Sequence, residues 1–118
     1  MLNVCLVAGG GALGSCARYL LSLLALRWVG GALPAGTLIV NVLGCFAAGV
    51  VATKVDPHGA LRIFLIPGVL GGFTTFSAFG LETQMLMRDG RPGLAAAYVA
   101  LSVGLGLCAV LLGHALSR

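Results

Sequence analysis

Four long apolar runs, separated by three short polar turns, limit what this chain can fold into. The runs cover about residues 2–26, 34–53, 60–87 and 93–116. A helix of about 20 apolar residues crosses the roughly 30 Å hydrocarbon core of a bilayer, so each run is long enough to cross once. The turns contain glycine, proline and charged residues, which end one helix and begin the next. The pattern predicts an all-α membrane protein, with residues 1–118 forming a single domain of four transmembrane helices.

Composition excludes several classes of soluble protein. Only 8% of the 118 residues are charged, whereas a soluble domain contains about 25% charged residues. The basic residues behind the net charge of +4 are scattered singly among apolar runs, so they form no patch for tracking a phosphate backbone. We therefore exclude a soluble enzyme, a nucleic-acid-binding protein and a secreted disulfide scaffold, and we expect membrane lipid around the chain.

Small residues inside the apolar runs predict close helix packing. The 19 glycines are about twice the usual share of about 7%, and several small residues recur four positions apart, which lets helix backbones approach. These pairs are Gly10 with Gly14, Gly44 with Ala48, and Cys45 with Gly49. Cys5, Cys16, Cys45 and Cys108 have no CxxC spacing and are predicted to be buried, reduced thiols.

The distribution of basic residues predicts how the helices are oriented in the membrane. Loops rich in Lys and Arg normally stay in the cytoplasm. Here the basic residues near the membrane surfaces are divided evenly, with Lys54, Arg62 and Arg118 on one side and Arg27, Arg88 and Arg91 on the other. We expect copies to insert in both orientations and to assemble as an antiparallel, dual-topology homodimer. The alternative is that other factors fix one orientation.

The third apolar run contains a segment poorly suited to an unbroken helix. Residues 71–75 read Gly-Gly-Phe-Thr-Thr, which pairs two weak helix formers with two hydroxyl residues at mid-membrane depth. We predict that the third helix is broken there. Non-helical backbone in a membrane is tolerated only inside protein or beside a water-filled cavity, and its freed carbonyls can bind a small cation. Two copies related by a two-fold axis would complete such a site.

Polar residues inside the spans predict a path across part of the membrane. Together with Phe79, they fall in the half of the membrane nearer the first and third turns: Arg18, Asn41, Glu82, Tyr98 and Ser102. The alternative is that these side chains only bond between helices, or that the arginine extends towards the lipid headgroups. Phe76 and Phe79 share a helix face, for which ordinary packing is the alternative.

Three motifs resemble the Fluc (CrcB) fluoride-channel family over the whole chain. They are GGALG at residues 10–14 followed by Arg18 and Tyr19, PAGTLIVNVLG at residues 34–44, and GGFTTFSAF at residues 71–79. The resemblance implies a channel rather than an enzyme, built as an antiparallel homodimer with two pores. It also implies a structural sodium ion (Na+) at the dimer interface and passive export of cytoplasmic fluoride across the bacterial inner or plasma membrane.

The resemblance assigns roles to residues near the predicted break. Gly71 and Thr74 match the positions whose backbone carbonyls hold the sodium ion. Phe76 and Phe79 match the phenyl pair that faces the fluoride pore, and Asn41 matches the pore asparagine.

The remaining matches belong to the pore and its entrance. Arg18 resembles the basic residue of the vestibule, while Tyr98 and Ser102 resemble the start of a polar track on the fourth helix. The third position of that track, usually a hydroxyl residue, is Gly106 in this chain. Glu82 lies near the vestibule, where we expect it to pair with Arg18 or a loop arginine, or to influence ion entry.

Two rival functions remain from the sequence alone. A small multidrug-resistance-type, proton-coupled exporter would need a carboxylate deep in the first helix, and this first run has no acidic residue. A non-transporting assembly subunit would explain the small-residue pairs but not a broken third helix.

Overall fold

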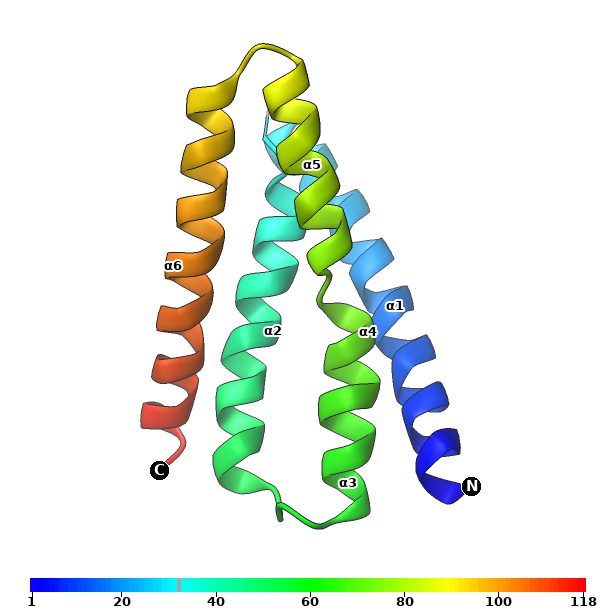
Figure 1. The fold of residues 1–118 in the computed structure, drawn as a ribbon. Coiled ribbons are helices and arrows are strands. Elements are labelled where there is room, and N and C mark those ends of the chain that lie inside the picture. Colours follow the sequence, from blue (N-terminus) through cyan, green and yellow to red (C-terminus); the bar gives the residue numbers. More distant parts are fainter. Residues whose placement is uncertain (32) are drawn as a thin grey trace.

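The computed structural model describes residues 1–31 and 33–118 and is helical throughout that part of the chain, apart from short turns (Figure 1). The elements in order are α1 (Leu2–Val29), α2 (Ala35–Lys54), α3 (Ala60–Ile63), the π-helix η1 (Phe64–Leu70), α4 (Gly71–Phe73), α5 (Phe76–Arg88) and α6 (Pro92–Leu116). Elements α3 to α5 follow one another as a single interrupted span, Ala60–Arg88.

Four helical segments are long and apolar enough to cross a membrane, which confirms the predicted fold class. Their outer surfaces expose large apolar side chains, as expected where lipid replaces water around a helix bundle. Trp28, for example, is 85% exposed beside Arg27 at the end of α1, a position where aromatic residues anchor a helix at the membrane interface. The protein is therefore a multi-pass membrane protein.

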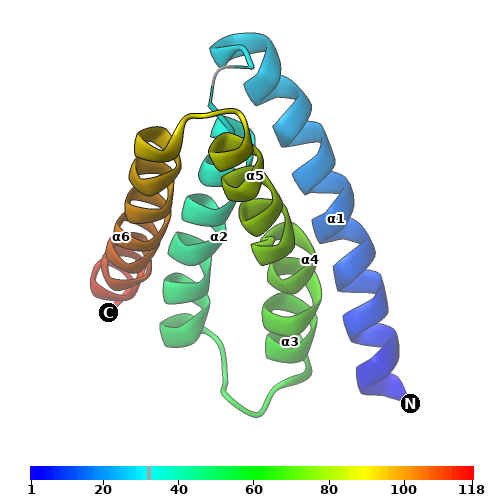
Figure 2. The ribbon, with the colours of Figure 1, turned by 45° about the horizontal axis from the view of Figure 1, so that its top comes forward.

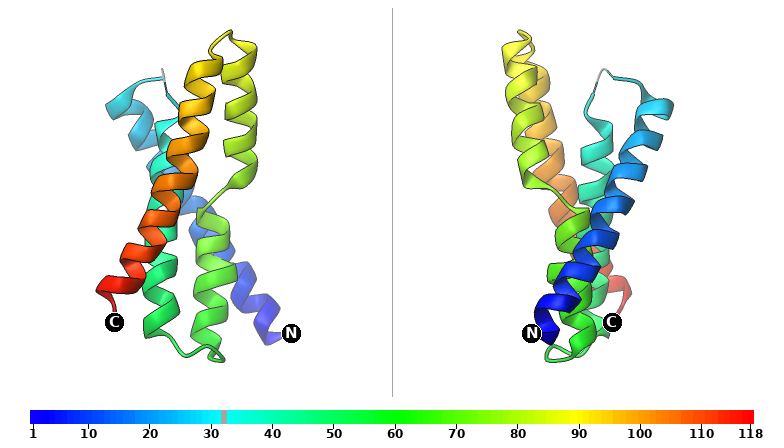
Figure 3. Two further views of the ribbon diagram at one scale, coloured as in Figure 1. Left: turned by 60° about the vertical axis from the view of Figure 1, so that its left-hand side comes forward. Right: turned by 90° about the vertical axis from the view of Figure 1, so that its right-hand side faces the viewer.

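The four spans are arranged so that both termini and the α2–α3 connection lie at one end (Figure 1). In Figure 2, α2 lies between α6 and the third span, with α1 on the far side. Helix α2 packs mainly against α6, and α1 packs mainly against η1 and α4. Beyond the interruption, α5 and the adjoining end of α6 diverge from the facing ends of α1 and α2 (Figure 3).

Glycines allow these helix pairs to approach closely. A Cβ atom added at Gly10 would stand 2.5 Å from the Phe64 carbonyl oxygen, and one added at Gly14 would stand 2.8 Å from the Phe73 nitrogen. The predicted packing role of Gly10 and Gly14 is confirmed, because a side chain at either position would push α1 away from the third span.

Two local features differ from the sequence expectation. The first half of the third span winds as the π-helix η1, which contains Pro67, a residue without a backbone N–H to donate. The cysteines are free as predicted, but Cys5, Cys16 and Cys108 are exposed on the protomer and only Cys45 is half-buried. The prediction that all four cysteines are buried was wrong for these three, because an apolar side chain on a membrane span can face lipid instead of packing against another helix.

Candidate functional site

The third helix is interrupted at Thr74 and Thr75. Both residues have extended backbone, with φ −82° and ψ 155° at Thr74 and φ −148° and ψ 119° at Thr75. The Thr75 hydroxyl then caps α5 by accepting from the Ala78 N–H at 3.2 Å. The predicted break is confirmed, although residues 71–73 are still helical and the extended backbone is confined to two residues.

Asn41 on α2 satisfies the backbone at the break. The Thr75 N–H donates to Asn41 Oδ1 at 2.8 Å, and Asn41 Nδ2 donates to the Thr75 carbonyl oxygen at 3.0 Å. One side chain thus replaces both partners that a neighbouring strand would supply. The second hydrogen of Asn41 Nδ2 takes no part in these two bonds and can be donated to another acceptor.

Helix α1 satisfies another carbonyl beside the break. Arg18 Nε donates to the Gly72 carbonyl oxygen at 3.1 Å, and the Ser15 hydroxyl donates to the same oxygen at 3.4 Å. In an unbroken helix this oxygen would accept from residue 76, which now begins α5. Arg18 therefore links α1 to the interruption through Nε. The two terminal nitrogens of its guanidinium take no part in this bond.

The carbonyls of Gly71 and Thr74 lose their helical donors at the break. The Thr75 N–H, which an unbroken helix would direct at Gly71, donates to Asn41 instead. The Ala78 N–H, which would serve Thr74, donates to the Thr75 hydroxyl. The oxygens of exposed Gly71 and half-buried Thr74 therefore lack the donors that an unbroken helix would supply, and carbonyl oxygens of this kind suit a small hard cation.

Side chains offer no rival metal site in the part of the chain that the structure describes. No group of three or more His, Cys, Asp or Glu side chains could hold a metal ion there. The Thr74 hydroxyl is itself occupied, because it donates to the Leu70 carbonyl oxygen at 2.8 Å. A cation at the break would depend on backbone oxygens.

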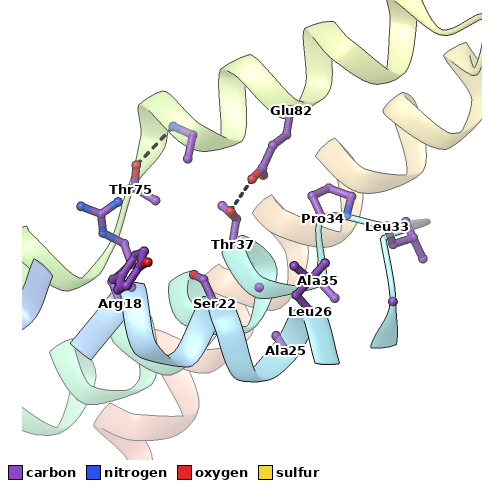
Figure 4. A pocket seen from close by; sticks show the side chains of 14 residues that line it. Arg18, Ser22, Ala25, Leu26, Leu33, Pro34, Ala35, Thr37, Thr75 and Glu82 are labelled. Atoms are coloured by element: carbon purple, nitrogen blue, oxygen red, sulfur yellow. Dashed lines mark hydrogen bonds between the residues drawn. The ribbon is translucent and has the colours of Figure 1, made fainter. Parts of the chain in front are cut away.

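A first cavity of about 360 Å³ opens between α1, the start of α2 and α5. We call it the vestibule cavity. Figure 4 shows Arg18 beside Thr75 at one end, with Thr37 and Glu82 further along. The two residues predicted for a vestibule, Arg18 and Glu82, therefore line one space. Ser22 adds a hydroxyl to the same wall.

Glu82 is held by two hydroxyl groups. The Thr37 hydroxyl donates to Oε1 and the Tyr98 hydroxyl donates to Oε2, each at 2.7 Å. Both donors are buried, with Tyr98 only 2% exposed. The expected pairing of Glu82 with Arg18 is not what the structure shows, because Arg18 is bonded to the Gly72 carbonyl.

A second cavity of about 260 Å³ lies on the other side of the break. We call it the phenylalanine cavity. Its lining residues come from α2, the break, α5 and α6: Asn41, Cys45, Thr74, Thr75, Phe76, Phe79, Ser102 and Val103. Four of the five predicted pore residues therefore meet here, and Thr75 lines both cavities.

The phenylalanine cavity contains an unused hydroxyl and two adjacent rings. The Ser102 Oγ atom is buried and has no hydrogen-bond partner among the described residues. The centroids of the Phe76 and Phe79 rings are 5.4 Å apart and their planes are tilted by 45°. Phe76 is 82% exposed, so packing inside the protomer does not explain its position.

Tyr98, the fifth predicted pore residue, is outside the lining of this cavity and links the two sites. Its ring packs against Phe79 with centroids 5.4 Å apart, while its hydroxyl bonds to Glu82 in the vestibule cavity. Thr37 and Cys45 were missed from the sequence. The spacing of the sequence could have indicated both residues, because Thr37, Asn41 and Cys45 are four residues apart and share one face of α2.

Comparisons with known proteins agree on one family. The family model described as "CrcB-like protein, Camphor Resistance (CrcB)" matches residues 5–114. A fluoride-specific ion channel FluC of Rhizobium johnstonii is 49% identical over 122 residues, covering 100% of this chain and 98% of that protein. The fluoride-specific ion channel FluC of Cereibacter sphaeroides is 51% identical over 113 residues, covering 95% of this chain and 91% of that protein. The FluC of Methylobacillus flagellatus is 46% identical over 123 residues, covering 100% of this chain and 96% of that protein.

Proposed function

This chain belongs to the CrcB family, and from that membership and the two cavities we propose that it is a fluoride channel of a bacterial membrane. It conducts an ion rather than catalysing a reaction. The observation that supports this most directly is the phenylalanine cavity, where Asn41, Phe76, Phe79 and the unpartnered hydroxyl of Ser102 meet beside a break in the third helix.

The donors of this cavity suit a small, strongly hydrated anion. A conducting pore must replace the water around the ion without binding it so tightly that it cannot leave. The Ser102 hydroxyl and the second hydrogen of Asn41 Nδ2 are neutral donors, and the positive edges of Phe76 and Phe79 add weak electrostatic contacts. We propose that fluoride passes this point by exchanging water for these modest contacts.

The vestibule cavity supplies the entrance in this proposal. The guanidinium of Arg18 lines it and raises the local concentration of anions. Thr75 lines both cavities, so the route passes the break itself. Glu82 is a structural acceptor for Thr37 and Tyr98 and fixes Tyr98 against Phe79.

Two copies in opposite orientations would form the active unit, with a pore for each. Both termini and the turn containing Lys54 lie at one end of the protomer, and the turn containing Arg88 and Arg91 lies at the other (Figure 1). The even division of basic residues supports insertion in both directions. The exposed Phe76 and Gly71 would then meet the second copy.

The residues at the break fit the sodium ion that the resemblance implies. The carbonyl oxygens of Gly71 and Thr74 would hold it, because their helical donors are diverted to Asn41 and Thr75. Paired from two copies, they would offer only neutral oxygen ligands, which suits a monovalent hard cation. The ion would supply positive charge between carbonyl dipoles that otherwise repel each other.

A proton-coupled exporter is the second candidate, and the structure weakens it. Helix α1 has no acidic residue, and Glu82 is bonded to two hydroxyls outside the phenylalanine cavity. A coupling carboxylate at the centre of the transport path is therefore missing from the described part of the chain.

Ion flux from liposomes tests the proposed function. The purified single chain is reconstituted in vesicles loaded with potassium fluoride, and efflux is started with a potassium ionophore in the absence of a pH gradient. We expect rapid loss of fluoride and negligible loss of chloride from matched vesicles. Drug-dependent proton movement without fluoride efflux would instead indicate an exporter, and neither activity would indicate an assembly subunit.

A further inference from the structure

Cys45 occupies a different environment from the other three cysteines. Its side chain lines the phenylalanine cavity together with Phe76, Phe79 and Ser102. Cys5, Cys16 and Cys108 are exposed on the outer surface of the protomer and line neither cavity. Cys45 lies one helical turn beyond Asn41 on the same face of α2.

Helix α6 places a buried glycine, Gly106, beside the thiol. A Cβ atom added at Gly106 would stand 3.5 Å from Cys45 Sγ, and the sulfur is the nearest atom that it would meet. One turn earlier on α6, the buried Ser102 Oγ lacks a partner in the described part of the chain. A buried polar atom without a partner beside a cavity indicates space for a polar guest. The thiol therefore faces a space that an ion or water can enter.

We propose that Cys45 is a binding site for soft metal cations inside the fluoride pathway, so that a bound metal closes the pore. This inference rests on the proposed channel function. Thiolate sulfur prefers soft metals such as Hg²⁺, whereas the hydroxyl and amide groups around it do not. When mercuric chloride reacts, the S–H bond breaks and an S–Hg bond forms, while a proton and one chloride ion are released. No electron is transferred.

Mercury inhibition of fluoride efflux tests this site. Three forms are reconstituted: the wild type, the Cys45→Ser variant, and a triple variant with Cys5→Ala, Cys16→Ala and Cys108→Ala that retains Cys45. Each is compared with its own untreated flux. Mercuric chloride should lower efflux by about tenfold or more in the wild type and the triple variant, because a metal in the pathway obstructs conduction. Excess dithiothreitol should restore the flux.

The Cys45→Ser variant should keep its own untreated flux in the presence of mercury. Inhibition of this variant to the same extent as the wild type, or resistance of the triple variant, would overturn the assignment. Should Cys45→Ser fail to fold, the triple variant decides alone, since Cys45 is its one remaining thiol. Absence of fluoride efflux from the untreated wild type would overturn the channel function and this inference with it, whereas efflux that mercury leaves unchanged would overturn only the role of Cys45.

Discussion

Asn41 and Thr75 form two hydrogen bonds that run in opposite directions between α2 and the interruption of the third helix. Thr75 donates its N–H to Oδ1 at 2.8 Å and accepts from Nδ2 at 3.0 Å. A broken helix in lipid must find partners for its freed backbone groups within the protein. Asn41 provides two of them, so the bonding between helices that was the alternative to a pore role for this residue is present.

Replacing Asn41 with alanine should therefore reduce both stability and conduction. Two half-buried backbone groups of Thr75 would lose their partners, and such a loss costs up to about 1–3 kcal/mol for each group that water does not reach. We expect a lower midpoint of thermal unfolding in detergent and a loss of fluoride efflux. An unchanged unfolding midpoint would show that these bonds do not stabilise the break.

Ser102→Ala is the matched comparison for Asn41→Ala, because we expect the Ser102 hydroxyl to contact the permeating ion without holding the fold together. The Ser102 hydroxyl has no partner among the described residues, so its removal breaks no bond in the protomer. Removing an unpaired buried polar group is neutral or slightly stabilising. We expect an unchanged unfolding midpoint with reduced fluoride efflux, measured on the same preparation. Normal efflux would remove this hydroxyl from the pore.

Phe76→Ile and Phe79→Ile distinguish a pore role from packing. Phe76 is 82% exposed, so replacing its ring should leave the protomer intact, while Phe79 also contacts Tyr98. An aliphatic side chain of similar bulk lacks the positive ring edge that would face fluoride. Both variants should assemble normally by size-exclusion chromatography and conduct less fluoride. Normal conduction in both would return the rings to a packing role.

The four helices and the break could be predicted from the sequence because both depend on local properties. The length of an apolar run determines whether a helix can cross the bilayer, and the Gly71-Gly72 pair followed by two threonines weakens the helix wherever it lies. The π-helix around Pro67 was not predicted, although the missing N–H of a proline inside a helix is a local signal for irregular winding.

The partners within the site depend on contacts that no local pattern encodes. Glu82 bonds to Thr37, 45 residues away, and Arg18 bonds to the carbonyl of Gly72, 54 residues away. Helical spacing indicates which residues share a face, but the neighbouring helix and its register follow from packing of all four spans. Pairing with Arg18 was one of the alternatives expected for Glu82, and the structure shows other partners for both side chains although they line one cavity.

The Glu82 hydrogen bonds predict a cost for losing the tyrosine hydroxyl. In Tyr98→Phe the ring still packs against Phe79, but Oε2 of Glu82 loses its donor. Hydrogen bonds to a charged group contribute about 1.5–3 kcal/mol, so the unfolding midpoint in detergent should fall measurably. Tyr19→Phe is the control, because Tyr19 is 65% exposed. Equal midpoints for the two variants would contradict a structural role for the Tyr98 hydroxyl.

Removal of sodium tests the proposed cation site at the break. Its ligands would be the backbone oxygens of Gly71 and Thr74, so side-chain replacement is a weak test, whereas withdrawing the ion acts on the site directly. Purified protein in potassium or N-methylglucamine salts should dissociate more readily into single chains, or conduct less fluoride, than in sodium, and adding sodium should reverse the change. Thr74→Ser keeps the hydroxyl that bonds to the Leu70 carbonyl and leaves the carbonyl of residue 74 in place, so this variant should depend on sodium as the wild type does. Indifference of the purified protein to sodium in both assembly and flux would mean that the freed carbonyls are satisfied by water or by the second copy alone.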